Sequence, residues 1–177
     1  MEPEMRAVAA YATRQHVEAH FEYLGHTKKD KPLGSGEIRR QFGLKLRAQN
    51  GCNLVYAMWR IEPKQELVIS VKSNPGQQTH AECGTRGYTN IKPEHSEALP
   101  HLSKGSRHTL RAMMEGSALR VFVDNKSVWE GDVGAAALEF DGPVGVRTDN
   151  ARFKFELFTE KDEKGQSTPC HADQGDE

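Results

Sequence analysis

Residues 41–61 read QFGLKLRAQNGCNLVYAMWRI, and this stretch decides the fold class. Its first half alternates apolar and polar residues, which is the period of a β-strand with one buried face. The alternating apolar positions are Phe42, Leu44, Leu46 and Ala48. The Asn50-Gly51 dipeptide is typical of a tight hairpin turn, and an apolar run follows it. We therefore predict two antiparallel strands, at residues 41–49 and 53–61.

Similar short runs, separated by turn signals, occur on both sides of this hairpin. They predict strands at residues 15–24, 67–72, 108–114, 119–123, 127–131, 142–147 and 152–158. Pro143 places the strand at 142–147 at a sheet edge, because proline cannot donate to a ladder. Only residues 94–99 and 134–138 suggest short helices. The sequence thus predicts an all-β fold, a two-sheet antiparallel jelly-roll sandwich.

The length of 177 residues, with 36% hydrophobic content, suits one domain with one core. We expect residues 1–159 to form this single β-sandwich domain. Apolar residues almost vanish from residue 160 onward, so we expect residues 160–177 to be a disordered polar tail.

The 24 Lys and Arg nearly balance the 25 Asp and Glu, so the protein has no large positive net charge that would attract nucleic acid. The longest apolar runs are far shorter than the roughly 20 residues of a membrane span. The first residues lack the basic leader of a secretory signal, so either the chain stays inside the cell or a signal has been removed. Cys52 and Cys83 either pair or remain free thiols, and Cys170 lies in the polar tail.

Three stretches resemble one superfamily of known domains. They are FGLKLRAQNGCNLVYAMWRIEP at residues 42–63, HTLRAMMEGSALRVFVDNKSVWEG at 108–131 and GPVGVRTDNARFKFELF at 142–158. Together they resemble the concanavalin A-like lectin and glucanase superfamily, nearest to bacterial keto-disaccharide hydrolase-type (laminin-G-like) domains. The resemblance implies a sandwich that binds or cleaves glycans, without naming a reaction.

The first hypothesis is a glycan-binding domain that uses the polar face of a sheet. Sugars present an apolar face and hydroxyl groups, so their sites combine aromatic and planar polar side chains. Polar side chains that point to the same face of two neighbouring strands fit this description. Arg147, in the third resembling stretch, is added to them. The candidate ligand-binding residues are Lys45, Arg47, Gln49, Tyr56, Arg60 and Arg147. A solvated face without a ligand is the alternative, and for Arg147, Asp149 and Asn150 a structural role at a strand end.

The second hypothesis is an enzyme, a polysaccharide lyase or a glycoside hydrolase. His80, Arg86 and Tyr88 are its candidate catalytic residues, because a uronate lyase needs a cation for the carboxylate and groups that move protons. Glu82 lies among them, but a retaining glycosidase needs two carboxylates. The third hypothesis is a protein-interaction module that docks a partner on the loop at residues 79–93.

The sequence predicts no cofactor. His16 and His20 lie four residues apart, which on a strand separates them by about 13 Å, too far for one zinc ion. Calcium binding is left open. Trp59 shares parity with apolar neighbours, which favours the core over ligand stacking, whereas Trp129 fits either place.

Overall fold

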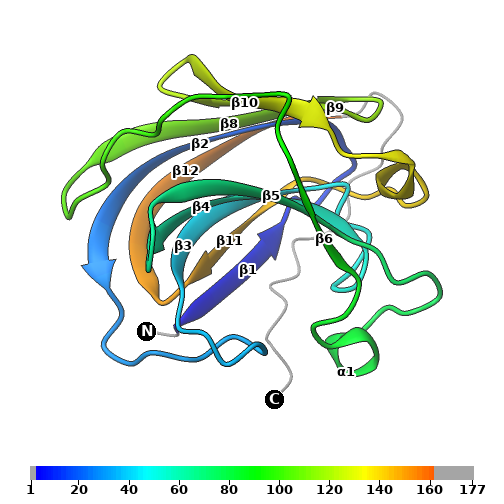
Figure 1. The fold of residues 1–177 in the computed structure, drawn as a ribbon, viewed down its shortest axis with the longest axis horizontal. Coiled ribbons are helices and arrows are strands. Elements are labelled where there is room, and N and C mark those ends of the chain that lie inside the picture. The colour runs from blue at the N-terminus through cyan, green and yellow to red at the C-terminus, as the bar shows by residue number, and fades with distance from the viewer. Residues whose placement is uncertain (1–2, 162–177) are drawn as a thin grey trace.

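The computed structural model describes residues 3–161. Two antiparallel six-stranded sheets pack face to face, as Figure 1 shows. Sheet A has, in spatial order, β1 (Glu4–Val8), β11 (Gly145–Asp149), β3 (Arg40–Leu46), β4 (Leu54–Glu62), β5 (Glu66–Lys72) and β6 (Tyr88–Ile91). Sheet B has β12 (Ala151–Lys161), β2 (Thr13–His26), β8 (Arg107–Glu115), β9 (Ala118–Val123), β10 (Lys126–Asp132) and β7 (His95–Ser96). The predicted fold class, an all-β two-sheet sandwich, is confirmed.

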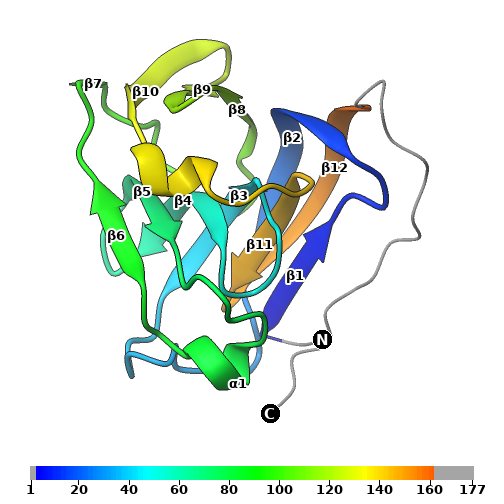
Figure 2. The same ribbon diagram turned by 90° about the vertical axis from the view of Figure 1, so that its right-hand side faces the viewer.

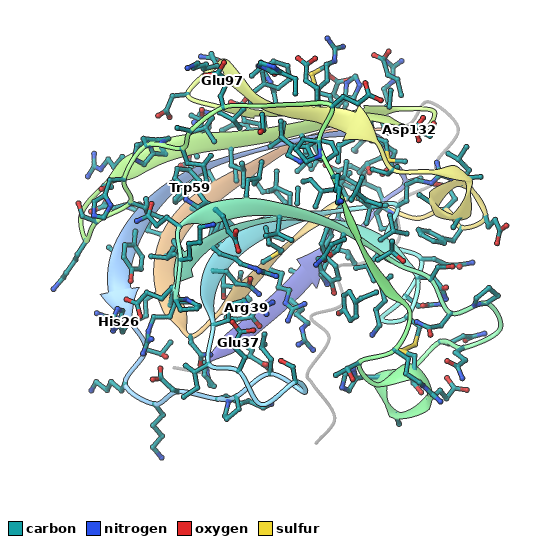
Figure 3. The ribbon with its side chains drawn as sticks, in the orientation of Figure 1. His26, Glu37, Arg39, Trp59, Glu97 and Asp132 are labelled. Atoms are coloured by element: carbon teal, nitrogen blue, oxygen red, sulfur yellow. A yellow bond between two sulfur atoms is a disulfide. The ribbon has the colours of Figure 1, made fainter. Side chains whose placement is uncertain are left out.

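The core lies between the sheets and is built by the predicted alternation of side chains. Trp59 on β4 is fully buried and meets the ring of Phe21 on β2 edge to face, with centroids 5.7 Å apart. Phe21 in turn stacks on Phe42 of β3 at 4.6 Å. Figure 3 shows Trp59 between the two layers. Trp129 is also buried, so both tryptophans belong to the core.

The prediction that the strand at residues 142–147 lies at an edge is wrong. β11 pairs with β3 on one side and with β1 on the other. Pro143 precedes the first residue of β11, so its missing N–H does not interrupt the ladder. The edge strand on this side of sheet A is β1, whose short sequence EMRAV gave no prediction of a strand.

The predicted antiparallel pairing of β3 with β4 is confirmed, but the tight turn predicted at Asn50-Gly51 is wrong, because β3 ends at Leu46 and β4 begins at Leu54. The backbone takes its left-handed conformation at Arg47, with φ of 47°. The side chain of Asn50 closes a wider loop, accepting hydrogen bonds from the Cys52 N–H and from Asn53 Nδ2 at 2.9 and 3.1 Å. This loop carries Cys52 toward α1 (His80–Cys83), where it forms a disulfide with Cys83.

The stretch between β5 and β8 contains two strands that the sequence did not indicate. β6 pairs with β5 in sheet A and β7 pairs with β10 in sheet B, so the chain crosses from one sheet to the other between them (Figure 2). A helix at residues 94–99 is therefore not present, because β7 lies there. The short helix expected at residues 134–138 is confirmed as the 3₁₀ turn η1 (Ala135–Leu138).

β12 runs to Lys161, two residues beyond the expected end of the domain. Residues 162–177, and with them Cys170 and most of the expected polar tail, lie outside the described residues. Between residues 3 and 161 there is no helix long and apolar enough to span a membrane.

Candidate functional site: the outer face of sheet A

The side chains of sheet A that point away from the core form an unusually polar surface, called here the outer face of sheet A. The register places Arg6 opposite Arg147, Lys45 opposite Tyr56, and Lys72 opposite Tyr88. Sheet A curves so that this face is concave, with α1 at one end and the segment before β3 at the other (Figures 1 and 2). Polar groups from all six strands of sheet A thus gather on one surface.

A buried ion pair lies at the centre of this face. The Arg147 guanidinium donates from Nε and Nη2 to the two oxygens of Asp149, at 2.9 and 3.2 Å. Gln41 Nε2 donates to the same carboxylate at 2.5 Å, and Asp149 has no exposed surface. Burial by itself lowers the pKa of Arg147. Asp149 and the nearby tyrosines outweigh this effect and raise the pKa above its ordinary value. Arg147 is therefore held in one position by Asp149 and stays protonated.

Lys72 is a second buried cation, with a different environment. Its ammonium group donates to the carbonyl oxygens of Gly51 and Gly84, at 3.0 and 2.8 Å. Among residues 3–161, no carboxylate lies within ion-pair distance of it. Burial, together with the charges of Arg147 and Arg6, lowers the pKa of Lys72 to about 8. Lys72 is thus a positive charge that the described part of the protein neutralises poorly.

Two tyrosines give the face an aromatic surface. The rings of Tyr56 and Tyr88 are nearly parallel, with centroids 6.3 Å apart. Arg147 lies 5.1 Å from the centre of the Tyr56 ring, and the Lys72 ammonium lies 5.1 Å from that of Tyr88. Burial raises the pKa of Tyr56 to about 12, so its hydroxyl stays protonated. Tyr88 is 43% exposed, which leaves its ring accessible to a ligand.

Three further arginines border this buried centre. Arg6 lies 3.7 Å from Glu4, Arg60 Nη1 donates to Glu66 at 3.0 Å, and Arg39 pairs with Glu37. Their side chains are between 19 and 28% exposed. Figure 3 shows Glu37 and Arg39 on the concave side of sheet A, opposite Trp59. These residues form an accessible rim around the less accessible centre.

Two glycines keep part of the face flat. A Cβ atom on Gly43 would lie 2.5 Å from Sδ of Met58, and one on Gly145 would meet the backbone of β1. Gly43 is opposite Arg147 in the β3–β11 ladder, and Gly145 is opposite Lys45. Arg147 and Lys45 therefore lie opposite positions without side chains, where Met58 and the β1 backbone pack closely against the sheet.

The candidate catalytic residues are only partly brought together. His80 begins α1 beside the face, and burial and the charges of Lys72 and Arg6 lower its pKa. Tyr88 lies on the face, but Arg86 turns back and donates to the carbonyl oxygens of Glu82 and Cys83. Glu82 caps α1 by accepting from Thr79 and Gln78, which lowers the pKa of its carboxyl. Neither Arg86 nor Glu82 is placed for catalysis on this face.

Four of the six candidate ligand-binding residues lie together on the outer face of sheet A: Lys45, Tyr56, Arg60 and Arg147. Arg47 and Gln49 do not continue that face, because both lie in the loop after β3. Arg47 Nε donates to the carbonyl oxygen of Phe140 at 2.9 Å, and the Gln49 N–H donates to the carbonyl oxygen of Asn53 at 3.1 Å. The expected structural role is confirmed for Asn150, whose side chain bonds to the backbone of Lys31 and Arg39.

Sequence reasoning missed Arg6 and Lys72 on this face. Arg6 was missed because β1 was not predicted. Lys72 closes the predicted strand LVISVK with the same parity as Ser70, which is a signal that could have been used.

Two cavities lie away from the outer face of sheet A. One of about 580 Å³ is lined by residues that include Tyr23, His26, Glu62 and Arg152, and one of about 410 Å³ by residues that include His20, His108 and Asp124. No candidate site residue lines either cavity. Within residues 3–161, no three His, Cys, Asp or Glu side chains are grouped so that they could hold a metal ion.

The fold is a jelly-roll sandwich of the concanavalin A-like class, as comparison with solved structures shows. The carbohydrate-binding module CBM66 from Bacillus subtilis superposes with a TM-score of 0.61 and 13% identity, over 91% of this chain and 84% of that one. A toad ovary galectin, solved with thio-digalactose, gives a TM-score of 0.52 and 10% identity, over 90% of this chain and 100% of that one. Congerin II variants are similar, for example at a TM-score of 0.53 and 10% identity, over 88% of this chain and 99% of that one. No model of a protein family matches the chain, and no curated protein matches it.

Proposed function

We propose that the protein binds a glycan on the outer face of sheet A. The observation that carries this proposal is the stacked pair of Tyr56 and Tyr88 beside the fixed guanidinium of Arg147. An accessible aromatic ring covers the apolar side of a sugar, while a planar cation with several donors bonds its hydroxyl oxygens. The names of two similar structures, a carbohydrate-binding module and a galectin with a digalactoside, support the same conclusion.

The rigidity of the site supports binding. Asp149 and Gln41 hold Arg147 in one position, so little side-chain entropy is lost when a ligand arrives. The disulfide between Cys52 and Cys83 joins the β3–β4 loop to α1, next to which Tyr88 begins β6. The site is therefore formed before a ligand binds.

A closer relationship to bacterial keto-disaccharide hydrolase-type domains is a further part of this proposal. It is supported by the three resembling stretches, which form β3 and β4, the β8 to β10 meander, and β11 with most of β12. A domain of that type would bind its glycan on the same face, with or without cleavage. The same binding experiment therefore includes a test for cleavage.

The test is affinity electrophoresis through native gels that contain neutral or acidic polysaccharides, stained for protein and for polymer. Tyr88→Ala removes the accessible ring of the site. Phe158→Ala is the matched control, because Phe158 is an aromatic residue on sheet B that is 49% exposed. We expect retardation of the wild-type protein and of Phe158→Ala in at least one polymer. Retardation of Tyr88→Ala should weaken, since packing of a sugar ring on the aromatic surface is lost.

Equal retardation of both variants would place binding elsewhere on the molecule and overturn the assignment of this face. No retardation by any polymer would contradict glycan binding and favour the protein-interaction module. A cleared zone in the polymer stain that is lost in His80→Ala would instead show an enzyme, with His80 as its proton-transfer group.

A further inference from the structure

Cations outnumber carboxylates on the outer face of sheet A. The cations are Arg6, Arg39, Lys45, Arg60, Lys72 and Arg147, and the carboxylates are Glu4, Glu37, Glu66 and Asp149. Each of these four carboxylates already pairs with an arginine of the face. The hydrogen bonds of Lys72 go to two neutral carbonyl groups. Lys72 therefore adds a positive charge that none of these four carboxylates pairs with.

Buried donors without an acceptor gather on the same face. The Nε–H groups of Arg6, Arg39 and Arg60 are all buried and have no hydrogen-bond partner. Buried polar groups are normally satisfied, so an orphaned donor indicates a missing acceptor. Arg40 and, on sheet B, Arg111 have the same unpaired group, and Gln41 has an unpaired oxygen, so the unpaired Nε–H groups add donors to this face while the excess of cations indicates the anion. Arginine prefers oxyanions because its fork matches their geometry.

Lys72 and His80 lie at the end of the face next to α1, and Arg6 and Arg147 act electrostatically on both. Arg6 and Arg147 are opposite each other on neighbouring strands. Lys72 contacts Tyr88 and the backbone that flanks both cysteines of the disulfide. His80 lies within electrostatic range of Lys72, Arg6 and Arg147, and also of the carboxylate of Glu4. An anion placed there would meet several cations and an accessible tyrosine ring.

We propose that the glycan is anionic, and that its carboxylate or sulfate group binds among Arg6, Lys72 and His80 while a sugar ring covers Tyr88. This inference rests on the proposed function and names its ligand class. A neutral sugar would leave the charge of Lys72 without a partner. An acidic sugar neutralises that charge, so the unpaired cation becomes a source of specificity. Uronates and sulfated sugars share this chemistry, and the experiment separates them.

The experiment measures affinity for matched pairs of polymers by titration calorimetry. Polygalacturonate is compared with the same polymer after full methyl esterification, and dextran sulfate with dextran. Within each pair the backbone is the same and only the charge differs. We expect the wild-type protein to bind the charged member of one pair at least tenfold more tightly. A preference for polygalacturonate over its ester indicates a carboxylate ligand, and a preference for dextran sulfate over dextran indicates a sulfate ligand.

Arg6→Gln removes a charge that is 28% exposed and whose carboxylate partner, Glu4, lies 3.7 Å away. Arg120→Gln is the matched control, because it removes the same charge from an exposed position on β9 of sheet B. We expect Arg6→Gln to bind the charged polymer about tenfold more weakly and Arg120→Gln to remain within twofold. His80→Gln, at an exposed position, provides a second variant if Arg6→Gln folds poorly, with folding checked by thermal melting.

Equal affinity for both members of each pair would overturn the anionic ligand and leave glycan binding intact. Binding to no polymer would overturn the proposed function itself. Equal losses in Arg6→Gln and Arg120→Gln would show that overall charge causes the attraction, and would overturn the site.

Discussion

The outer faces of the two sheets carry similar residues in different surroundings. On sheet A, Arg147 and Asp149 form an ion pair whose side chains are 9 and 0% exposed. On sheet B, Arg107 donates to Glu22 at 3.0 Å, but Arg107 is 79% exposed. Both faces alternate charged and apolar residues along their strands, as the sequence shows. What differs is how much water reaches the charges.

This difference separates a solvated surface from a prepared site. Exposed pairs such as Arg107 with Glu22 contribute about 0–1 kcal/mol to stability. A buried pair is expensive to desolvate and is often replaceable by apolar residues without loss of stability. The outer face of sheet A therefore holds charges that stability alone does not require. Ligand recognition gives a reason for them.

The comparison is tested most strongly by removing one carboxylate from each face. Asp149→Ala leaves Arg147 buried without its partner, so we expect the free energy of unfolding to fall by about 3–5 kcal/mol. Glu22→Ala should change it by less than about 1 kcal/mol. Urea denaturation of both variants measures the difference. Similar losses would mean that the two faces are energetically alike.

The second largest loss of stability is expected on removal of the disulfide. Among the described residues, a disulfide lies near the outer face of sheet A and none lies near that of sheet B. Cys52 and Cys83 are separated by 31 residues, and a crosslink of that span contributes about 3–4 kcal/mol by restricting the unfolded chain. The double variant Cys52→Ala with Cys83→Ala should lose about this much in urea denaturation. It should also bind the glycan more weakly, while Cys170→Ala should do neither. An unchanged affinity would show that α1 keeps its place without the crosslink.

Lys72 predicts a pH dependence of stability that sheet B does not share. Its folded pKa of about 8 lies below the ordinary value of 10.5, so between these pH values the unfolded chain binds more protons than the folded protein. The free energy of unfolding should therefore rise as pH increases from about 8 to about 10. The raised pKa of Tyr56 acts in the opposite direction only above about pH 10.

The measurement is urea denaturation at both ends of that window, in a Cys170→Ser background to avoid thiol exchange. Groups that face Lys72 are Arg6, Arg147, His80 and Tyr88. Lys72→Met should flatten the rise. A rise of the same size in Lys72→Met would assign it to another group.

The smallest effect is expected on sheet B. Arg111 lies 3.6 Å from Glu18 and 4.5 Å from the centre of the Phe122 ring, at a half-exposed position. Arg111→Gln should change the free energy of unfolding by less than about 1 kcal/mol, and added salt should reduce that change further. A loss near that of Asp149→Ala would show that this face also depends on its charges.

Local patterns in the sequence predicted the strands well and the connections poorly. Phe42, Leu44 and Leu46 alternate strictly, and burial of one face requires that alternation, so β3 was predictable. The pairing of β3 with β4 was predicted correctly, but the tight turn at Asn50-Gly51 was not, because the dipeptide indicates local turn preference only. The loop there is shaped by Asn50 and by the disulfide partner Cys83, which lies 31 residues away from Cys52.

The candidate site was predictable only where parity along a strand was decisive. Lys45, Tyr56 and Arg60 were assigned to one face correctly, because neighbouring antiparallel strands keep side chains in register. Arg47 was assigned to the same face, but the strand had already ended. The burial of Lys72 and its carbonyl partners depends on α1 and on the β3–β4 loop, and no local pattern reveals such contacts.

The crossing from β6 to β7 has a consequence for self-association. Exposed sheet edges are templates on which a second chain can add a strand. β6 covers β5 in sheet A and β7 covers β10 in sheet B, and these two strands are only four and two residues long. The segment from β6 to β7 therefore leaves only a few unpaired backbone groups at this edge of each sheet, so a second molecule has little to pair with there. Lys92 and Glu94, exposed between the strands, add charges that oppose stacking of molecules edge to edge.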